Sequence, residues 1–244
     1  MKRFLSLRRL AVALCLSPGS AALASLTIFQ GTDFGVAVGA PRPNSDAAAA
    51  AFKLATGVFS IIDFENAPVG DFATLALGSG VSVSLIGTAP NGGISTLSSN
   101  TLGFNTTPGG TKFLHLSPPA NNPLAAAVFA FTTPIDSFGS YLTGLGTASG
   151  NLHLAFNDGS SQDLSVIGNA AGGVQFFGFT DFGKSISSVS LEILNTTSSF
   201  DRIGIDDVIL HPVAVVPEPA TVCFGFALIG ACLGIRPRRP GGRE

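Results

Sequence analysis

Two adjacent carboxylates near the end of the chain are the residues whose type and spacing point most directly to chemistry. In the segment IGIDDVIL, residues 203–210, Asp207 falls in phase with the isoleucines, and Asp206 falls in phase with Val208 and Leu210. At least one carboxylate therefore points toward an apolar face of a strand, unless a β-bulge intervenes. Because an unpaired buried carboxylate is costly, pairing with Arg202 or with loop amides at the strand end is one expected solution.

Other residue types give little support for catalysis. The sequence has no Gly-x-Ser-x-Gly, His-Glu-x-x-His or Cys-x-x-Cys pattern. His115 and His153 each lie one residue out of phase with neighbouring leucines, so we predict that both face solvent, and His211 opens a linker. Paired acids leave a glycosidase open as an alternative, but the chain has no Trp and one Tyr, Tyr141, to stack on sugars. We expect no catalytic residues.

The charge and the cysteines limit the class of protein. Residues 25–217 carry five Lys or Arg against thirteen Asp or Glu, a net charge of −8, which argues against a nucleic-acid partner. The cysteines, Cys15, Cys223 and Cys232, all lie in apolar end segments. No disulfide or zinc-thiolate site is therefore expected in the body, which must fold by burying a core.

The N-terminus has the pattern of a cleaved secretory signal over residues 1–24. A basic start is followed by the apolar stretch Leu10 to Leu16 and by small residues at Ala22 and Ala24. We therefore expect an exported protein, with cleavage after Ala24.

The body between the two ends is patterned as one short helix followed by strands. The segment NSDAAAAAFKLAT has candidate caps at Asn44, Ser45 and Asp46 and predicts a helix that ends near Gly57. Short apolar runs between Gly, Asn, Ser and Pro clusters then predict an antiparallel two-sheet β-sandwich. The predicted strands are residues 58–65, 80–86, 112–116, 126–132, 135–142, 150–156, 162–167, 174–180, 186–194 and 203–210.

These patterns divide the chain into six parts. After the signal we expect a lead-in segment with the short helix, the β-sandwich domain, a linker with Pro-Glu-Pro, a transmembrane helix and a basic cytoplasmic tail. Their boundaries are 25–57, 58–211, 212–219, 220–235 and 236–244.

The C-terminal tail combines a stiff segment, an apolar run and a basic end. Residues 220–235 carry no charge and would reach about 24 Å as a helix, enough to span a locally thinned bilayer. The basic residues that follow would stay in the cytoplasm by the positive-inside rule, so the body lies outside. Pro217 and Pro219 hold Glu218 in an extended segment next to the membrane. The basic residues are Arg236, Arg238, Arg239 and Arg243.

This order of Val-Pro-Glu-Pro, apolar run and arginine cluster resembles the PEP-CTERM sorting signal of Gram-negative bacteria. The resemblance covers about the last thirty residues. It implies processing by an exosortase at the Pro217-Glu218-Pro219 motif, transient anchoring in the inner membrane, and release to the cell surface or extracellular matrix. It also implies an association with exopolysaccharide and biofilm.

The body resembles the jelly-roll carbohydrate-binding modules through the segments IDFENAPVG, FFGF and DRIGIDDVIL. That resemblance implies a structural calcium ion between the first and last strands. Its ligands would be Glu65 and Asp206, with Asp207 or Asp63 in reserve, and calcium takes such oxygen ligands. No other cofactor is expected.

Together these features predict a secreted, non-enzymatic β-sandwich with a structural or adhesive role at the cell surface or in the matrix. One alternative is a carbohydrate-binding module for exopolysaccharide. A second alternative is a glycoside hydrolase or another enzyme that acts on polysaccharide.

Overall fold

The computed structural model describes residues 26–87, 92–100, 102–117, 124–144, 149–156, 159–166, 172–194 and 202–213. They form helix α1 (Pro43–Thr56) and strands β1 (Thr27–Phe34), β2 (Ser60–Ile62), β3 (Gly70–Asp71), β4 (Thr74–Gly78), β5 (Val81–Ile86), β6 (Gly93–Ser95), β7 (Phe113–Leu116), β8 (Leu124–Thr143), β9 (Ser149–Phe156), β10 (Ser161–Val166), β11 (Gly173–Thr180), β12 (Ile186–Leu194) and β13 (Ile203–Pro212). The prediction of a mainly antiparallel β fold with one short helix is confirmed.

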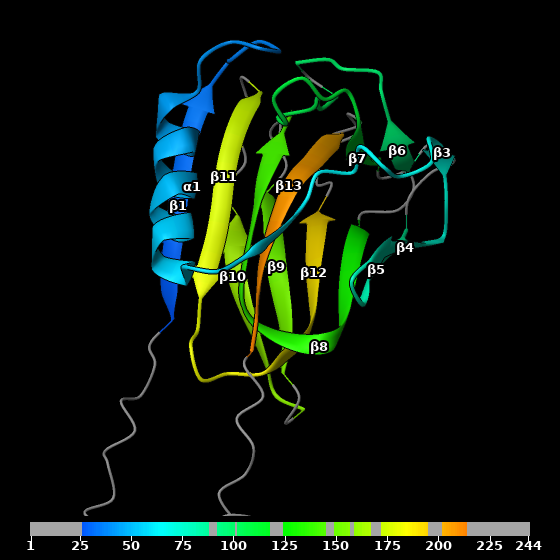
Figure 1. Cartoon of the computed structure of the whole chain (residues 1–244). Coiled ribbons are helices and arrows are strands. Elements are labelled where there is room, and N and C mark those ends of the chain that lie inside the picture. The colour runs from blue at the N-terminus through cyan, green and yellow to red at the C-terminus, as the bar shows by residue number, and fades with distance from the viewer. Residues whose placement is uncertain are drawn as a thin grey trace, which may run out of the picture.

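The long strand β8 belongs to both layers of a β-sandwich (Figure 1). Its first half pairs with β5 and β12, and β9 and β10 extend that layer beyond β12. Its second half pairs with β11 and β13 in the other layer. There β1 pairs with β11, while β2 and β7 pair with opposite halves of β13. Every one of these pairs is antiparallel.

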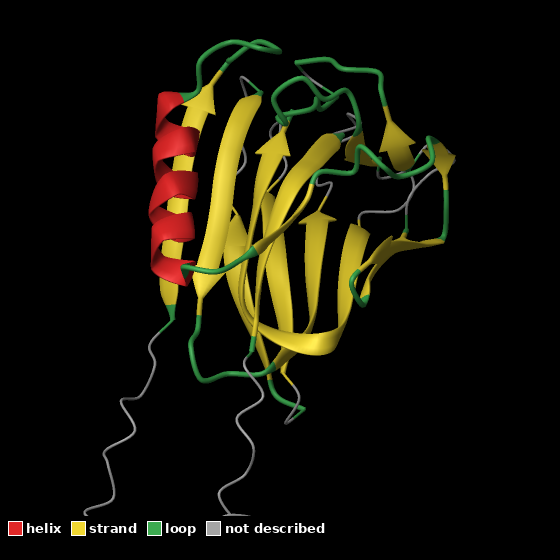
Figure 2. Ribbon diagram, in the orientation of Figure 1, coloured by secondary structure: helices red, strands yellow, loops and turns green. Residues whose placement is uncertain are grey.

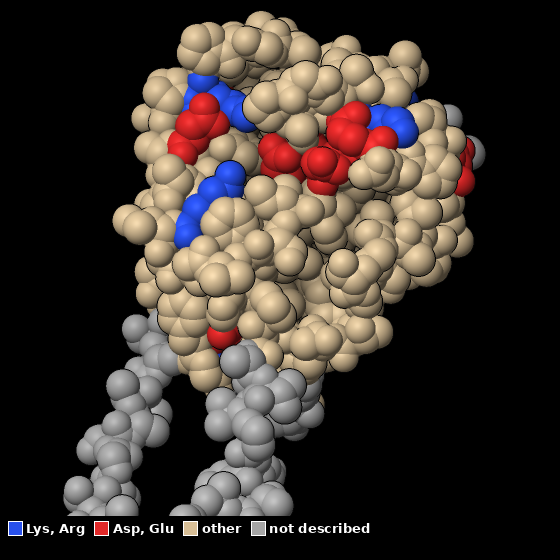
Figure 3. Space-filling view, viewed as in Figure 1, with Lys and Arg blue, Asp and Glu red and all other residues tan. Residues whose placement is uncertain are grey.

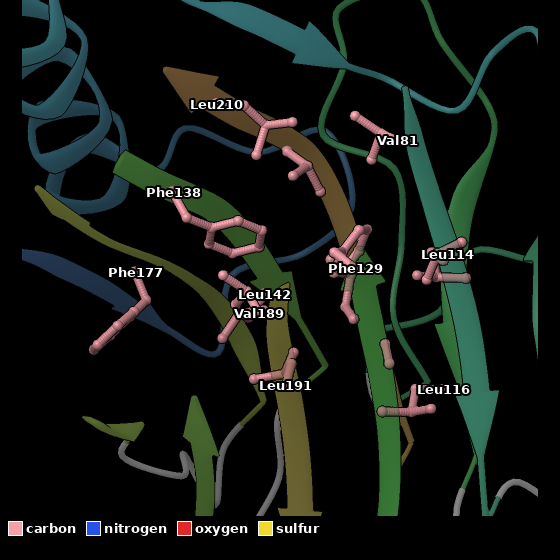
Figure 4. Packing of buried hydrophobic residues seen from close by; sticks show 14 of the residues in the cluster. Val81, Leu114, Leu116, Phe129, Phe138, Leu142, Phe177, Val189, Leu191 and Leu210 are labelled. Carbon is pink, nitrogen blue, oxygen red and sulfur yellow. The ribbon is translucent and has the colours of Figure 1, made fainter. Parts of the chain in front are cut away.

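The main core lies between the two layers. Figure 4 shows Val189 and Leu191 of β12 beside Leu142 of β8, with Phe177 of β11 nearby. The rings of Phe129 and Phe138, one from each half of β8, lie 5.6 Å apart. The bend in β8 therefore joins the two layers through aromatic packing as well as through the backbone.

Helix α1 covers the outer face of the layer that contains β1 and β11 (Figure 2). Phe52 is fully buried against Phe29 and Phe176, with ring centroids 5.6 Å from each. A Cβ atom at Gly139 of β8 would lie 2.8 Å from Phe176 and 3.0 Å from Phe52. Because both faces are covered, every residue of β11 is buried, whereas a half-exposed strand would alternate.

A bulge in β13 changes the phase of the strand at the two adjacent carboxylates. The pairing of β13 with β8 shifts between Asp206 and Ile209, and Asp207 has φ +46°. Before the bulge Ile203 and Ile205 face the main core, and after it Val208 and Leu210 do. The bulge is the exception that the sequence analysis allowed, and the uninterrupted phase does not continue after Asp206.

Other differences concern strand boundaries. The two predicted strands 126–132 and 135–142 form the single bent strand β8, and the predicted strand 58–65 shrinks to β2. Phe64, at φ +59°, cannot continue an extended strand. The prediction missed β1, β3, β4 and β6, so the lead-in segment 25–57 supplies a strand of the sheet.

The two ends of the described chain lie at the same end of the sandwich. Ser137 of β8 is flanked in the sheet by Thr180 and His211, and Thr180 is flanked in turn by Thr27. Strand β1 therefore begins at the same end of the sheet at which β13 ends, with β11 and β8 between them, as Figure 1 shows. The described residues contain no helix long and apolar enough to cross a bilayer. The predicted signal and transmembrane segments lie outside those residues.

Candidate functional site

A cleft lined by both polar and apolar residues opens at the end of the sandwich opposite the chain ends, and we call it the distal cleft. Its volume is about 540 Å³. Its walls come from three segments: the loop after β1 with the first turn of α1, the loop after β6, and the loop before β7, all at the top of Figure 1. The lining residues are Val38, Gly39, Ala40, Pro41, Arg42, Asp46, Thr96, Ser98 and 104–111.

The first wall is held by Asp33, a buried residue of β1. Its carboxylate accepts hydrogen bonds from the backbone N–H groups of Asn44 (3.1 Å) and Ser45 (2.7 Å) and from both side chains. Burial raises the pKa of Asp33, but these hydrogen bonds outweigh burial and leave that pKa below its ordinary value. The Asp33 side chain of strand β1 thus holds the first turn of helix α1 in place, as an N-cap side chain would. The predicted caps at Asn44 and Ser45 act as donors instead.

Arg42 connects this wall to the loop before β7. Its Nε atom donates to Asp46 Oδ1 and its Nη2 atom donates to the Thr106 carbonyl, each at 2.8 Å. Its guanidinium lies 4.5 Å from the ring centroid of Tyr141, and Tyr141 Oη donates to Asp46 at 2.8 Å. Burial, together with the Asp46 hydrogen bond, raises the pKa of Tyr141. Ring stacking and hydrogen bonds therefore fix the guanidinium in one orientation.

The second wall is held by Asp206, which is fully buried under the loop before β7. Asp206 Oδ2 accepts from the N–H groups of Thr106 (2.6 Å) and Thr107 (3.2 Å), while Oδ1 has no hydrogen-bond partner. The Thr106 hydroxyl lies 3.0 Å from both Asp206 Oδ2 and Asp207 Oδ2, and the Thr107 hydroxyl donates to Asp207 Oδ1 at 2.7 Å. Burial and the nearby Asp207 charge raise the pKa of Asp206 to about 7. The predicted conflict is thus resolved by loop amides rather than by Arg202.

The same loop is closed at its other end by Glu65. Glu65 Oε1 accepts from the Asn105 side chain and from the N–H groups of Thr111 and Lys112, at 2.8 to 2.9 Å. Lys112 Nζ donates back to the carbonyl oxygens of Glu65 and Ala67. Acidic side chains gather on this face beside a basic one (Figure 3). Three carboxylates therefore fasten one loop.

The structure brings the predicted calcium ligands Glu65, Asp206 and Asp207 to this loop: Asp206 and Asp207 share the Thr106 hydroxyl, whereas Glu65 bonds to Asn105, Thr111 and Lys112. Asp63 lies apart and accepts from the Glu65 N–H at 3.1 Å. The described residues contain no group of three or more His, Cys, Asp or Glu side chains arranged to hold a metal ion. Asp206 Oδ1 is the oxygen that lacks a partner. Calcium binding stays a prediction.

The remaining predicted site residues lie outside the residues that the structure describes. They are Ala22 and Ala24 of the signal, the motif Pro217, Glu218 and Pro219, and the basic residues Arg236, Arg238 and Arg239. Conversely, sequence reasoning missed Asp33, Arg42 and the Thr106-Thr107 pair. The loop segment NTTPGG was visible in the sequence, but nothing in it indicates which carboxylates it contacts.

The histidines do not form a catalytic arrangement in the described part of the chain. His115 is buried, so the prediction that it faces solvent was wrong: all four residues of β7 are buried, and the strand has no solvent face. His153 bonds to Asp163 at 2.6 Å near the protein surface. His211 and the Ser137 hydroxyl both bond to Asp136 Oδ1, at 2.7 and 2.9 Å. A nucleophile relay would need the serine bonded to the histidine itself.

Of two other clefts, one lies away from the distal cleft and the other lies beside it. A groove of about 580 Å³ runs between the β2 segment and β4–β5 and is lined largely by aliphatic side chains such as Ile62, Leu77 and Leu210. A third cleft of about 470 Å³ contains His115 and Arg202 and shares Thr96 with the distal cleft. Of these three clefts in the described part of the chain, the distal cleft is the one lined by Arg, Asp, Asn and Thr side chains together.

No protein-family model matches the chain, and no curated protein matches it. Among solved structures, an exo-beta-agarase is similar with 13% identity and a TM-score of 0.41, over 65% of this chain and 26% of that one. A mutant of a family 29 carbohydrate-binding module complexed with mannohexaose has 10% identity and a TM-score of 0.40, over 63% and 90%. Another family 29 module has 9% identity and a TM-score of 0.37, over 63% and 87%. This chain therefore spans about a quarter of the agarase and most of the modules.

Proposed function

We propose that the protein is an exported, non-catalytic module that binds polysaccharide in its distal cleft. The main support for this proposal is the set of chemical groups that line the cleft. Guanidinium, carboxylate, amide and hydroxyl groups line one concave surface of about 540 Å³, the size range of small-molecule sites. Sugar hydroxyls both donate and accept hydrogen bonds, so a mixed set of donors and acceptors suits them better than a charged or purely apolar surface.

The anchoring of the walls supports binding. Asp33, Asp206 and Glu65 hold the two walls through hydrogen bonds to the backbone, so the cleft is shaped before a ligand arrives. A preformed site loses less conformational entropy on binding than a flexible one.

The carboxylates argue against the hydrolase alternative. Glycoside hydrolysis needs two carboxyl groups that flank the scissile bond. Asp46 is the single carboxylate among the residues that line the distal cleft. Asp206 has a raised pKa, as a general acid would, but its side chain is fully buried beneath the loop. A sugar ring cannot reach it there.

Binding is tested with the purified full chain in detergent micelles, on an array of neutral and acidic oligosaccharides and then by calorimetry with the best oligosaccharide. Ala40 lines the cleft, whereas Ala37 lies on the same loop, is also exposed, and does not line it. We expect Ala40→Arg to weaken binding at least tenfold and the matched variant Ala37→Arg to change it less than twofold. A flat array would leave the structural or adhesive role, and equal losses would move binding away from this cleft.

We also propose that export and sorting follow the sequence signals at the two ends. The position of both described chain ends opposite the distal cleft supports this, because a tail anchor there leaves the cleft facing away from the membrane. Replacing Pro217, Glu218 and Pro219 with alanine should leave the protein in the membrane fraction with its full C-terminus. Normal release of that variant would contradict sorting by an exosortase. We propose in addition that the β-sandwich has a jelly-roll topology.

A further inference from the structure

The end of the sandwich where the chain enters and leaves exposes several apolar side chains. Helix α1 packs on β1, the strand that begins there, and its last turn and the residues that follow expose Leu54 (86%) and Val58 (81%). Ile28, the second residue of β1, and Phe182, in the loop after β11, are also exposed. In sequence, Lys53 is adjacent to Leu54, and Lys184 lies two residues after Phe182. We call these six residues the basal surface.

Two carboxylates near the basal surface are turned inward. Asp136 and Asp181 are buried, and Asp136 is bonded to His211 and Ser137. Burial raises the pKa of Asp181, opposed by Lys184 and assisted by the Asp136 charge. Lysine and exposed aliphatic or aromatic side chains are the combination found on proteins that lie at a lipid interface, where lysine reaches the headgroups.

Exposed apolar residues alone do not select this end, because Leu97 at the other end is also 81% exposed. The short chain that connects the body to the predicted membrane anchor is what distinguishes this end. Val213 is the last described residue, and the uncharged run begins at Ala220, so the connecting chain reaches at most about 25 Å in any conformation. A tether of this reach keeps the basal surface at a high effective concentration near the bilayer, so that a weak contact is sufficient.

We propose that the basal surface lies against the outer surface of the lipid bilayer while the tail is anchored, with the distal cleft pointing away from it. This rests on the anchoring that is part of the proposed function. The contact fixes the orientation of the body instead of leaving it to rotate freely on its tether. The occupant of the basal surface is thus the bilayer itself.

The absence of tryptophan from the chain allows a direct test. Val58→Trp and Leu97→Trp place a single fluorophore at two positions with equal exposure, at opposite ends of the body. The full-length variants are incorporated into nanodiscs whose lipids carry bromine near the headgroup end of the acyl chains. We expect at least twofold quenching of Val58→Trp relative to unbrominated discs and less than 10–20% change for Leu97→Trp, since bromine quenches on contact at about van der Waals range.

A second reporter, Phe182→Trp, tests the same surface from a different segment, and it keeps an aromatic side chain at a partly exposed position. Equal quenching of the basal and distal reporters, strong or weak, in protein that stays with the discs would overturn the basal contact while leaving the anchor intact. Protein that does not stay with the discs would overturn both the anchor and the contact. Glycan binding by the same variants reports separately on the distal cleft.

Discussion

Asp33 and Asp206 perform the same mechanical task in two walls of the distal cleft, yet their pKa values move in opposite directions. Each is a buried aspartate on a strand, and each accepts two backbone N–H groups from a neighbouring segment. The pKa of Asp33 falls below its ordinary value, whereas the pKa of Asp206 rises to about 7. Burial acts upward on both pKa values, but it is the largest cause at the fully buried Asp206, whereas at Asp33 the hydrogen bonds outweigh it.

At Asp33 both carboxylate oxygens accept hydrogen bonds, and the donors lie in the first turn of a helix, where the backbone favours negative charge. At Asp206 one oxygen has no partner and a second carboxylate, Asp207, lies next in the chain. Hydrogen bonds from the Thr106 and Thr107 N–H groups and from the Thr106 hydroxyl therefore position the Asp206 carboxylate. They do not offset burial and the Asp207 charge, which raise its pKa.

The largest expected effect is the loss of the Asp33 anchor. Asp33→Ala removes the acceptor of four hydrogen bonds and leaves the Ser45 N–H buried, so the free energy of unfolding should fall by about 4 kcal/mol. Urea denaturation followed by circular dichroism measures it. Asp33→Asn, which keeps one oxygen, should cost less than half as much, and equal costs would show that the hydrogen bonds are not the reason.

The second effect is a pH dependence that belongs to Asp206. Its pKa is raised in the folded state, so between about pH 4 and pH 7 the folded chain holds a proton that the unfolded chain has released. The stability from this group is present at low pH and is lost as pH rises through 7. Between pH 5 and pH 8 wild type should lose about 3 kcal/mol more than Asp206→Asn. Parallel pH slopes for the two proteins would contradict the raised pKa.

The smallest effect concerns the hydrogen bond between Tyr141 and Asp46 that supports the wall held by Asp33. Tyr141→Phe keeps the ring beneath Arg42 and removes only the hydroxyl, so we expect a loss of about 1 kcal/mol. A double-mutant cycle with Asp46→Ala isolates the pair. If the two changes are additive, Asp46 stabilises the wall through Arg42 alone.

The elements with strong apolar patterns were predictable from sequence, and the anchors of the cleft were not. The helix from Pro43 to Thr56 and strands such as β11 and β12 follow directly from local composition. Strand β1 was missed because TIFQGTDF has little alternation, since it lies at a sheet edge with α1 over one face. The role of Asp33 was missed for the same reason, because it depends on a helix that begins ten residues later.

The Asp206-Asp207 pair shows where phase arguments fail. The conflict between the two carboxylates and the apolar residues around them was visible, and a bulge was the stated exception. Its position at Asp207 could not be derived, because it depends on the pairing of β13 with β8 and on the loop from residue 104 to 112. Local sequence indicates that a carboxylate must be satisfied, but tertiary contacts decide by which group.

The pairing of β1 has a consequence for the order in which the protein acquires its structure. Among the described residues, β1 pairs with β11 alone, more than one hundred residues later in the chain. Such distant pairing gives a high contact order and slow folding. A chain that crosses a membrane from its N-terminus would carry β1 and Asp33 across early. Strand β1 could not form its native pairing until residues up to 180 had also crossed.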